Sequence, residues 1–213
     1  MYLHILCTVF AVVAGLVVVI PPASNRTLSN ADKITTEHVV LQTFINKFVP
    51  WISPWLIIIK GLCMVRIIML NDPSFAHLIP SISQLLPGIF LMFFGAVLRL
   101  WCFWELGHLF TYTLTIRKEH KLVITGPYRF LCHPSYTGIL LFSAGLACNV
   151  DCAVYTYYIA NLPFIIYFII DMAMSAIPLF FRMSAEDQML ASHFGKSWEL
   201  YRNDRWRLVP FIY

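Results

Sequence analysis

The feature that most constrains this chain is a series of long apolar stretches separated by more polar segments of different lengths. A helix needs about 20 apolar residues to cross the hydrocarbon core of a bilayer. Stretches near that length cover residues 2–20, 51–70, 85–106, 135–150 and 153–181. Only 12% of the residues are charged, against about one quarter in a typical soluble domain. We therefore predict an all-α integral membrane protein with about five transmembrane helices.

The first stretch has an alternative interpretation as a cleaved signal peptide. It lacks a basic segment before the apolar core, and the core exceeds the ~7–15 residues usual in signal peptides. We therefore favour a membrane helix. The chain shows no internal repeat or linker-like tract, which predicts a single membrane domain over residues 1–213. Residues 1–84 would form N-terminal helices and residues 85–213 a functional core.

Basic residues are distributed unevenly over the polar segments. Segments 21–47 and 107–134 and the tail from Arg182 carry Lys and Arg, whereas segments 71–84 and 149–152 carry none. The positive-inside rule places the basic group in the cytosol, so the N-terminus would be lumenal and the C-terminus cytosolic. The formal net charge of +4 lies on short segments and not along one stripe. It favours an anionic lipid surface as the partner and no nucleic acid.

Three basic residues, Lys60, Arg66 and Arg99, lie inside the predicted membrane stretches. An intramembrane charge marks a functional site by default, but a long side chain near a helix end also snorkels to the interface. For Lys60 and Arg66 we favour snorkelling or a carbonyl partner. Arg99 lies close to the 107–134 connection, where a role in a site and a structural role are equally supported.

The six cysteines form no Cys-x-x-Cys pair, so a zinc or redox motif is not predicted. Cys148 and Cys152 flank a predicted tight lumenal turn at residues 149–152. A disulfide between them is an alternative, and two free thiols are the favoured interpretation.

An ordered series of short motifs begins at residue 98. It comprises Leu98-Arg99-x-Trp101, Leu106-Gly107, Phe110-Thr111, His120-Lys121-Leu122-Val123, Gly126-Pro127-Tyr128, His133-Pro134-Ser135-Tyr136-x-Gly138, Arg182-x-x-x-Glu186-Asp187, Phe194-Gly195, Trp198, Tyr201 and Pro210-Phe211. Together these motifs, over roughly residues 85–213, resemble the isoprenylcysteine carboxyl methyltransferase family. Two positions depart from the family pattern: Cys132 stands where arginine is common, and Asp187 where glutamate is common.

The resemblance implies an enzyme of the endoplasmic reticulum membrane that methylates the carboxylate of an S-prenylated cysteine at the C-terminus of a protein or peptide. It implies S-adenosyl-L-methionine as cofactor, held at a cytosolic site formed by the 107–135 connection and the C-terminal helix. The cofactor contacts carried over by the resemblance are Thr113, His120, Lys121, Leu122, Val123, Tyr128, His133, Pro134, Ser135, Tyr136 and Glu186. The resemblance also implies that Arg182 contacts the substrate, and no metal is implied.

The chemistry of the residues around position 135 fits this expectation. Pro134 suits the first turn of a helix, where its missing N–H costs nothing, and the remaining free N–H groups would attract an anion. The carboxylate of a methionine-type cofactor is one candidate. Tyr128, His133 and Tyr136 offer ring faces and hydrogen bonds for adenine and ribose. The alternative treats the tyrosines as interfacial aromatics and His133 as a helix cap.

Arg182 and Glu186 are four residues apart on the predicted continuation of the last helix, so they share a face. An exposed ion pair with arginine first is the weaker orientation and contributes only a few tenths of a kcal/mol, which favours separate catalytic roles. A guanidinium can bind the substrate carboxylate through two parallel hydrogen bonds. The acid would hold cationic or hydroxyl groups of the cofactor, and catalysis would consist mostly of positioning the reactants.

Three alternative functions share part of the pattern. A phospholipid amine N-methyltransferase would share the cofactor half but has less need of Arg182. An NADPH-dependent membrane sterol reductase would share the Phe194-Gly195-Lys196-x-Trp198-x-x-Tyr201 pattern and the apolar C-terminus. A lipid-binding or scaffold protein without activity is the third alternative.

Overall fold

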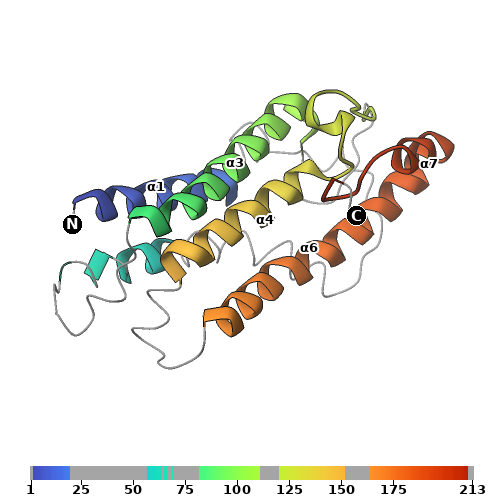
Figure 1. Cartoon of the computed structure of the whole chain (residues 1–213). Coiled ribbons are helices and arrows are strands. Elements are labelled where there is room, and N and C mark those ends of the chain that lie inside the picture. Colours follow the sequence, from blue (N-terminus) through green and yellow to red (C-terminus); the bar gives the residue numbers. More distant parts are fainter. Residues whose placement is uncertain are drawn as a thin grey trace.

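The computed structural model describes residues 2–19, 57–63, 65–66, 69, 82–110, 120–151 and 164–210. The described elements are helices and helical turns (Figure 1). In chain order they are α1 (Tyr2–Val19), α3 (Ile82–Leu106), η4 (Gly107–Leu109), η5 (Gly126–Arg129), α4 (Pro134–Leu146), η6 (Ala147–Asp151), α6 (Phe164–Phe194) and α7 (Lys196–Asn203). A further helical segment covers residues 57–63.

Glycines bring α3 and α4 into backbone contact along an antiparallel crossing. A Cβ atom on Gly95 of α3 would lie 2.6 Å from the carbonyl oxygen of Gly138 on α4, and one on Gly138 would lie 2.8 Å from that of Gly95. About two turns away along the same crossing, a Cβ atom on Gly145 of α4 would clash with the carbonyl oxygen of Gly88 on α3. The two glycines on each helix are seven residues apart (95 − 88 = 145 − 138 = 7), which is about two helical turns. Each helix therefore presents a glycine to the other helix at two points along the crossing.

The core beside this crossing combines alanines with larger apolar side chains. It joins α1, the 57–63 segment, α3 and the α4–η6 helix through Ala11, Ala14, Ile57, Met92, Ala96, Phe142 and Leu146. The alanines let the helices approach closely, which is the usual way that helices associate in lipid. Figure 1 shows α1, α3 and α4 side by side, with α6 beside α4 and α7 at the end of α6.

Two of the described helices are long and apolar enough to cross a membrane, over Leu85–Leu109 and Phe168–Phe194. Residues 6–16 of α1 form a shorter apolar helix. The described residues of each predicted apolar stretch are helical, which confirms the predicted helical architecture and is consistent with a membrane protein. The five-span topology remains a prediction, because most of residues 51–70 and 153–163 lie outside the described ranges.

The predicted turn at residues 149–152 is wrong for the described residues. The chain continues beyond α4 as the π-helical turn η6, Ala147–Asp151. Asn149 is buried there, and its Nδ2 donates to the carbonyl of Leu85 at 3.1 Å. This hydrogen bond stabilises a helical position that the sequence, with its turn-forming Asn and Asp, did not indicate. Cys148 carries a free thiol, as favoured, and Cys152 lies outside the described residues.

An acidic residue that the sequence analysis passed over pairs with Lys60. The Nζ atom of Lys60 lies 3.5 Å from Oδ1 of Asp171 on α6, and both side chains are less than one third exposed. The structure thereby corrects the interpretation of Lys60 as a snorkelling residue: its charge is compensated within the protein, as expected of a charge at membrane depth. Arg66 is exposed.

The glycine crossing predicts that one added methyl group is enough to disturb the fold. Gly95→Ala should lower the melting temperature in detergent, because its Cβ would collide with backbone atoms that cannot turn aside; overpacking of this kind costs about 1–3 kcal/mol. Val97→Ile also adds one carbon to α3, but at an exposed position, and should leave the melting temperature unchanged. Equal melting temperatures for wild type and Gly95→Ala would contradict the close crossing.

Candidate functional site

The start of α4 is set by Pro134, as the sequence predicts. Proline occupies the first helical position, and His133 precedes it with a non-helical backbone (φ −126°, ψ 58°). The N–H groups of Tyr136 and Thr137 turn back to the carbonyl of His133, at 3.0 and 3.2 Å. The side chains of His133, Ser135 and Tyr136 therefore lie close together at the start of α4.

The connection before His133 is folded against the end of α3. Gly126 has a positive φ of 57°, and a Cβ there would lie 2.6 Å from a carboxylate oxygen of Glu105. The hydroxyl of Thr125 donates to the same carboxylate. The η5 turn that follows carries Tyr128, whose backbone N–H donates to the carbonyl of Thr125 at 3.1 Å. These contacts place the 120–133 connection over α3.

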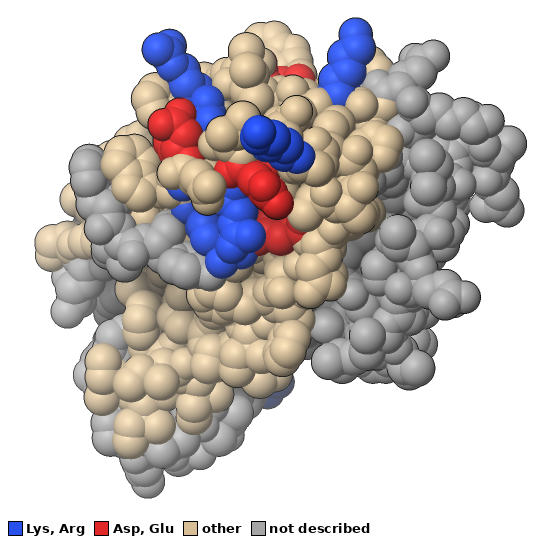
Figure 2. Space-filling model, turned by 90° about the vertical axis from the view of Figure 1, so that its right-hand side faces the viewer, with Lys and Arg blue, Asp and Glu red and all other residues tan. Residues whose placement is uncertain are grey.

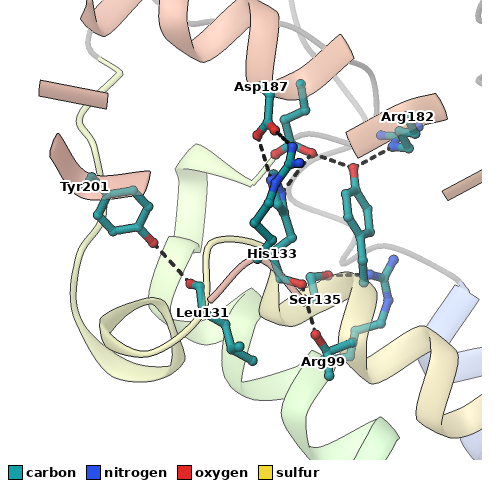
Figure 3. A network of polar contacts seen from close by, with 11 residues as sticks. Arg99, Leu131, His133, Ser135, Arg182, Asp187 and Tyr201 are labelled. Atoms are coloured by element: carbon teal, nitrogen blue, oxygen red, sulfur yellow. Dashed lines mark hydrogen bonds and ion pairs between the residues drawn. The ribbon is translucent and has the colours of Figure 1, made fainter. Parts of the chain in front are cut away.

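Helix α7 covers the connection from the other side. Gly195, with a φ of 52°, separates α6 from α7, and α7 buries Trp198 and Tyr201. The hydroxyl of Tyr201 lies 2.8 Å from the carbonyl of Tyr128 and 3.2 Å from that of Leu131 (Figure 3). Burial raises the pKa of Tyr201, so its hydroxyl remains a proton donor to these carbonyls.

The segment after α7 then runs beside residues 131–137. The backbone N–H of Cys132 donates to the carbonyl of Trp206 at 2.8 Å, and that of His133 to the carbonyl of Arg207 at 3.0 Å. The hydroxyl of Thr137 donates to the carbonyl of Leu208 at 2.6 Å. We call residues 204–208 the tail strap. It ties the C-terminal end of the chain to the start of α4.

His133, Asp187 and Arg207 form a chain of polar contacts, and Figure 3 shows His133 pointing at Asp187. Nε2 of His133 lies 2.8 Å from Oδ1 of Asp187, and the guanidinium of Arg207 contacts Oδ2 of the same carboxylate. His133 and Asp187 are only 4% and 6% exposed. The His133 ring also stacks on Tyr136, with centroids 5.5 Å apart and planes at 15°. His133 is thereby held on three sides by the protein.

Tyr136 links the two residues to which the sequence analysis gives catalytic roles. Its hydroxyl donates to Oε2 of Glu186 and accepts from Nε of Arg182 at 3.0 Å. Arg182 and Glu186 are on the same face of α6, as predicted, and the tyrosine hydroxyl lies between them. The tyrosine thus fixes the direction of the guanidinium and of the carboxylate relative to α4.

Arg99 belongs to the same neighbourhood. It is 5% exposed, its guanidinium donates to the hydroxyl of Ser135, and it lies 4.8 Å from the centroid of the Phe103 ring. The structure therefore places Arg99 at the start of α4, in contact with Ser135 of the predicted site. Figure 2, which faces this end of the molecule, shows acidic and basic side chains gathered on the upper part of the described surface, above a larger area of uncharged residues.

Cys132, one of the two departures from the family pattern, is a buried and unreactive group. Burial and the charge of Asp187 raise the pKa of its thiol to about 11, so the thiol is protonated at neutral pH. It packs with Trp198 and Tyr201. The other departure, Asp187, is the residue that links His133 to Arg207.

The structure brings together His133, Ser135, Tyr136, Arg182 and Glu186 from the predicted set. Leu122 packs against the cluster of Cys132, Trp198 and Tyr201, and His120 lies against Phe194 with ring centroids 6.0 Å apart. Pro134 is buried, Val123 is half-buried and Lys121 is exposed. Thr113 lies outside the described residues. The sequence analysis named Asp187 only as a departure and gave Arg207 no role beyond basic charge.

Comparisons with known proteins agree with the motifs. The model of the isoprenylcysteine carboxyl methyltransferase (ICMT) family matches residues 88–192, a range that contains most of α3, all of α4 and the Arg182–Asp187 segment. Protein-S-isoprenylcysteine O-methyltransferase B of Arabidopsis thaliana is 39% identical over 67 residues, which are 29% of this chain and 34% of that protein. Protein-S-isoprenylcysteine O-methyltransferase A of the same plant is 31% identical over 93 residues, 38% of this chain and 47% of that protein.

A third relative is a probable protein-S-isoprenylcysteine O-methyltransferase of Oryza sativa subsp. indica, 34% identical over 67 residues, 29% of this chain and 35% of that protein. The matched regions span between about one third and one half of the length of these relatives. The resemblance found in the motifs is thereby confirmed: residues 88–192 of this chain match the isoprenylcysteine carboxyl methyltransferase family.

Proposed function

We propose that this chain transfers a methyl group from S-adenosyl-L-methionine to the C-terminal carboxylate of an S-prenylated cysteine in a protein or peptide. The observation that carries the proposal is the arrangement of Arg182, Tyr136 and Glu186, in which one hydroxyl holds a cation and an anion side by side at the start of a helix. The names of the relatives support the same substrate class.

Arg182 is the group that suits the anionic half of the reaction. The substrate carboxylate is ionised at neutral pH, so no general base is required. A guanidinium binds a carboxylate through two parallel hydrogen bonds and can hold one oxygen toward the reacting carbon. Because Nε of Arg182 already donates to Tyr136, the plane of the guanidinium is oriented before the substrate arrives. The contribution of Arg182 is therefore positioning and neutralisation of charge.

The residues also fit an S-adenosyl cofactor. When bound, the cofactor supplies an electrophilic methyl group on a sulfonium, which the carboxylate oxygen accepts as the carbon–sulfur bond breaks. Glu186, beside Tyr136, can hold cationic or hydroxyl groups of the cofactor. The residues that would surround the rest of it are Thr113, His120, Lys121, Leu122, Val123, Tyr128, His133, Pro134 and Ser135.

A buried donor in the same region supports this fit. Trp198 is 2% exposed, packs with Leu122 and Cys132 and meets the His133 ring edge-on at 6.3 Å. Its indole N–H has no acceptor in the described part of the chain. Buried polar groups are almost always hydrogen-bonded, so an acceptor atom of a bound ligand is the natural partner for this N–H.

The apolar surface beside Arg182 suits a prenyl chain that arrives from the bilayer. Ile177, Phe180 and Phe181 directly precede Arg182 on α6, and all three are exposed. A prenyl group that stays in lipid keeps the roughly 0.8 kcal/mol contributed by each buried CH₂, while its carboxylate reaches Arg182. The reacting group of an amine-methylating enzyme is not an anion, so a guanidinium at this position favours a carboxylate as the reacting group.

We place the site at the cytosolic face of the endoplasmic reticulum membrane, with a lumenal N-terminus and five spans. In support, the start of α4, the end of α6 and α7 lie at one end of the molecule (Figure 1). Basic residues of the connection and of the tail belong to the same region, among them Arg129 and Arg205, which are joined by a hydrogen bond from Nε of Arg205 to the carbonyl of Arg129 at 3.1 Å.

This orientation predicts that the Asn25-Arg26-Thr27 sequon remains unmodified, because residues 21–47 would face the cytosol. Protein expressed in eukaryotic membranes should run at the same mass before and after glycosidase treatment. A glycosidase-sensitive mass shift that disappears in Asn25→Gln would reverse the orientation.

The Trp198 indole predicts a specific loss of cofactor affinity. Trp198→Phe should weaken binding of S-adenosylhomocysteine about tenfold, the usual scale for one buried hydrogen bond, when binding is measured by calorimetry well below the melting temperature. Trp104→Phe makes the same chemical change at a fully exposed position of α3 and should bind normally. If Trp198→Phe is less stable but keeps full affinity, the indole serves only packing.

The arrangement of Arg182 and Glu186 predicts two phenotypes that differ in kind. Arg182→Ala should lose methyl transfer to N-acetyl-S-farnesylcysteine by roughly 10²–10³-fold and keep its affinity for S-adenosylhomocysteine. Arg182→Lys should recover only part of the activity, because an ammonium lacks the planar two-pronged geometry. Glu186→Ala should weaken S-adenosylhomocysteine binding instead.

Arg202→Ala, at an exposed position of α7, is the matched control and should behave as wild type in both assays. Equal loss of cofactor binding in Arg182→Ala and Glu186→Ala would contradict the division of roles. Inactivity of the wild type toward prenylcysteine, together with transfer to a phospholipid amine, would contradict the proposed substrate.

A further inference from the structure

The tail strap carries a charged residue, Arg207, that lies outside the family match to residues 88–192 and has no role in the chemistry above. Its guanidinium contacts Oδ2 of Asp187, and its carbonyl accepts the backbone N–H of His133 at 3.0 Å. Arg207 therefore contacts the start of α4 through its backbone and α6 through its side chain.

The two oxygens of Asp187 serve different partners. Oδ2 contacts the guanidinium of Arg207, and Oδ1 lies 2.8 Å from Nε2 of His133. A guanidinium is always protonated, and an ionised carboxylate can only accept hydrogen bonds. With Arg207 as its counter-charge, Asp187 remains an acceptor, so Nε2 of His133 must be the nitrogen that donates. Arg207 thereby determines which nitrogen of the buried ring carries the proton.

The other ring nitrogen faces the proposed cofactor side of the site. Nδ1 of His133 lies 4.0 Å from Oε2 of Glu186, which is too long for a direct hydrogen bond. In the neutral ring with its proton on Nε2, Nδ1 is an acceptor, so two acceptors lie on either side of this gap. Such a pair suits one group that carries more than one N–H, and an S-adenosyl cofactor carries an ammonium of this kind.

We infer that Arg207 is a positioning residue of the proposed cofactor site: through Asp187 it fixes the proton and the ring plane of His133, so that Nδ1 and Glu186 form a pair of acceptors for a donor group of the cofactor. This inference rests on the proposed function. It gives Asp187 a defined role as the link between the strap and His133. It also explains why His133 is almost fully enclosed: its ring orients the site while Asp187, Tyr136 and Trp198 hold it in place.

Loss of the guanidinium should change the site in a definite direction. Without the guanidinium of Arg207, the Asp187 carboxylate would lose the contact that holds Oδ1 against Nε2 of His133. The His133 ring could then turn, and Nδ1 would no longer lie beside Glu186 to receive the donor group of the cofactor. The effect should therefore be on cofactor affinity and on the KM for S-adenosylmethionine, more than on kcat at saturation.

The test compares Arg207→Met with Arg205→Met in the full chain, in detergent or nanodiscs. Arg205 is the matched control: it lies on the same strap, donates to the carbonyls of Arg129 and Tyr201 at 3.1 and 3.2 Å, and stacks over the Tyr201 ring at 4.4 Å. Both variants should lower the melting temperature. Only Arg207→Met should weaken S-adenosylhomocysteine binding, about tenfold, as expected for loss of a charge-assisted contact.

Two further variants distinguish a role of Arg207 in positioning His133 from a role in only attaching the tail strap to the rest of the protein. Arg207→Lys keeps the cation and should recover most of the affinity. Asp187→Asn should weaken S-adenosylhomocysteine binding to the same extent as Arg207→Met, and the double variant should be no weaker than either single variant, because both act through one chain of contacts. If Arg207→Met does not fold, Arg207→Lys and Asp187→Asn carry the comparison with Arg205→Met.

The inference is overturned if Arg207→Met and Asp187→Asn bind S-adenosylhomocysteine as the wild type does, or if Arg205→Met loses the same affinity as Arg207→Met. These results would leave the proposed function intact, because they require a wild-type protein that binds S-adenosylhomocysteine. Failure of the wild type to bind S-adenosylhomocysteine would instead remove the proposed function and this inference with it.

Discussion

The close approach of α3 and α4 is the constraint on which the rest of the structure depends. In lipid, helices gain little by hiding apolar side chains from one another, so they associate through close packing and hydrogen bonds. Gly88, Gly95, Gly138 and Gly145 allow the two backbones to touch at two levels, and Asn149 adds a hydrogen bond to Leu85 at the far end. This contact fixes where α4 begins relative to Arg99 on α3, and hence where Ser135 and Tyr136 lie.

Charge compensation accounts for the organisation of the opposite end. The guanidiniums of Arg182 and Arg207 and the carboxylates of Glu186 and Asp187 lie around His133 and Tyr136. Removing such groups from water is costly unless each finds a partner. Here the carboxylates of Glu186 and Asp187 contact groups from α4 or from the strap. The same contacts that compensate these charges also orient the side chains. The polar network therefore connects α4, α6 and the tail strap, and it also preorganises the candidate site.

Much of this architecture could be predicted from local sequence. Pro134 indicated the first turn of α4, and the unbroken run after residue 181 indicated that the last helix carries Arg182 and Glu186 on one face; the structure agrees with both. Contacts between distant segments could not be predicted in the same way. Asp171 is a single acid in an apolar stretch, and only the fold places it beside Lys60. Arg207 is one of several basic residues near the C-terminus, and no local pattern indicates that it reaches Asp187.

The tail strap has a consequence for how the protein matures. Its carbonyls at Trp206, Arg207 and Leu208 accept hydrogen bonds from the start of α4, roughly seventy residues earlier in the chain. During synthesis α3 and α4 can therefore insert and pack long before residues 204–208 have left the ribosome. A nascent chain at that stage has the packed α3–α4 pair but not the enclosed histidine, so the ability to bind ligand should arise only after the tail strap has been synthesised.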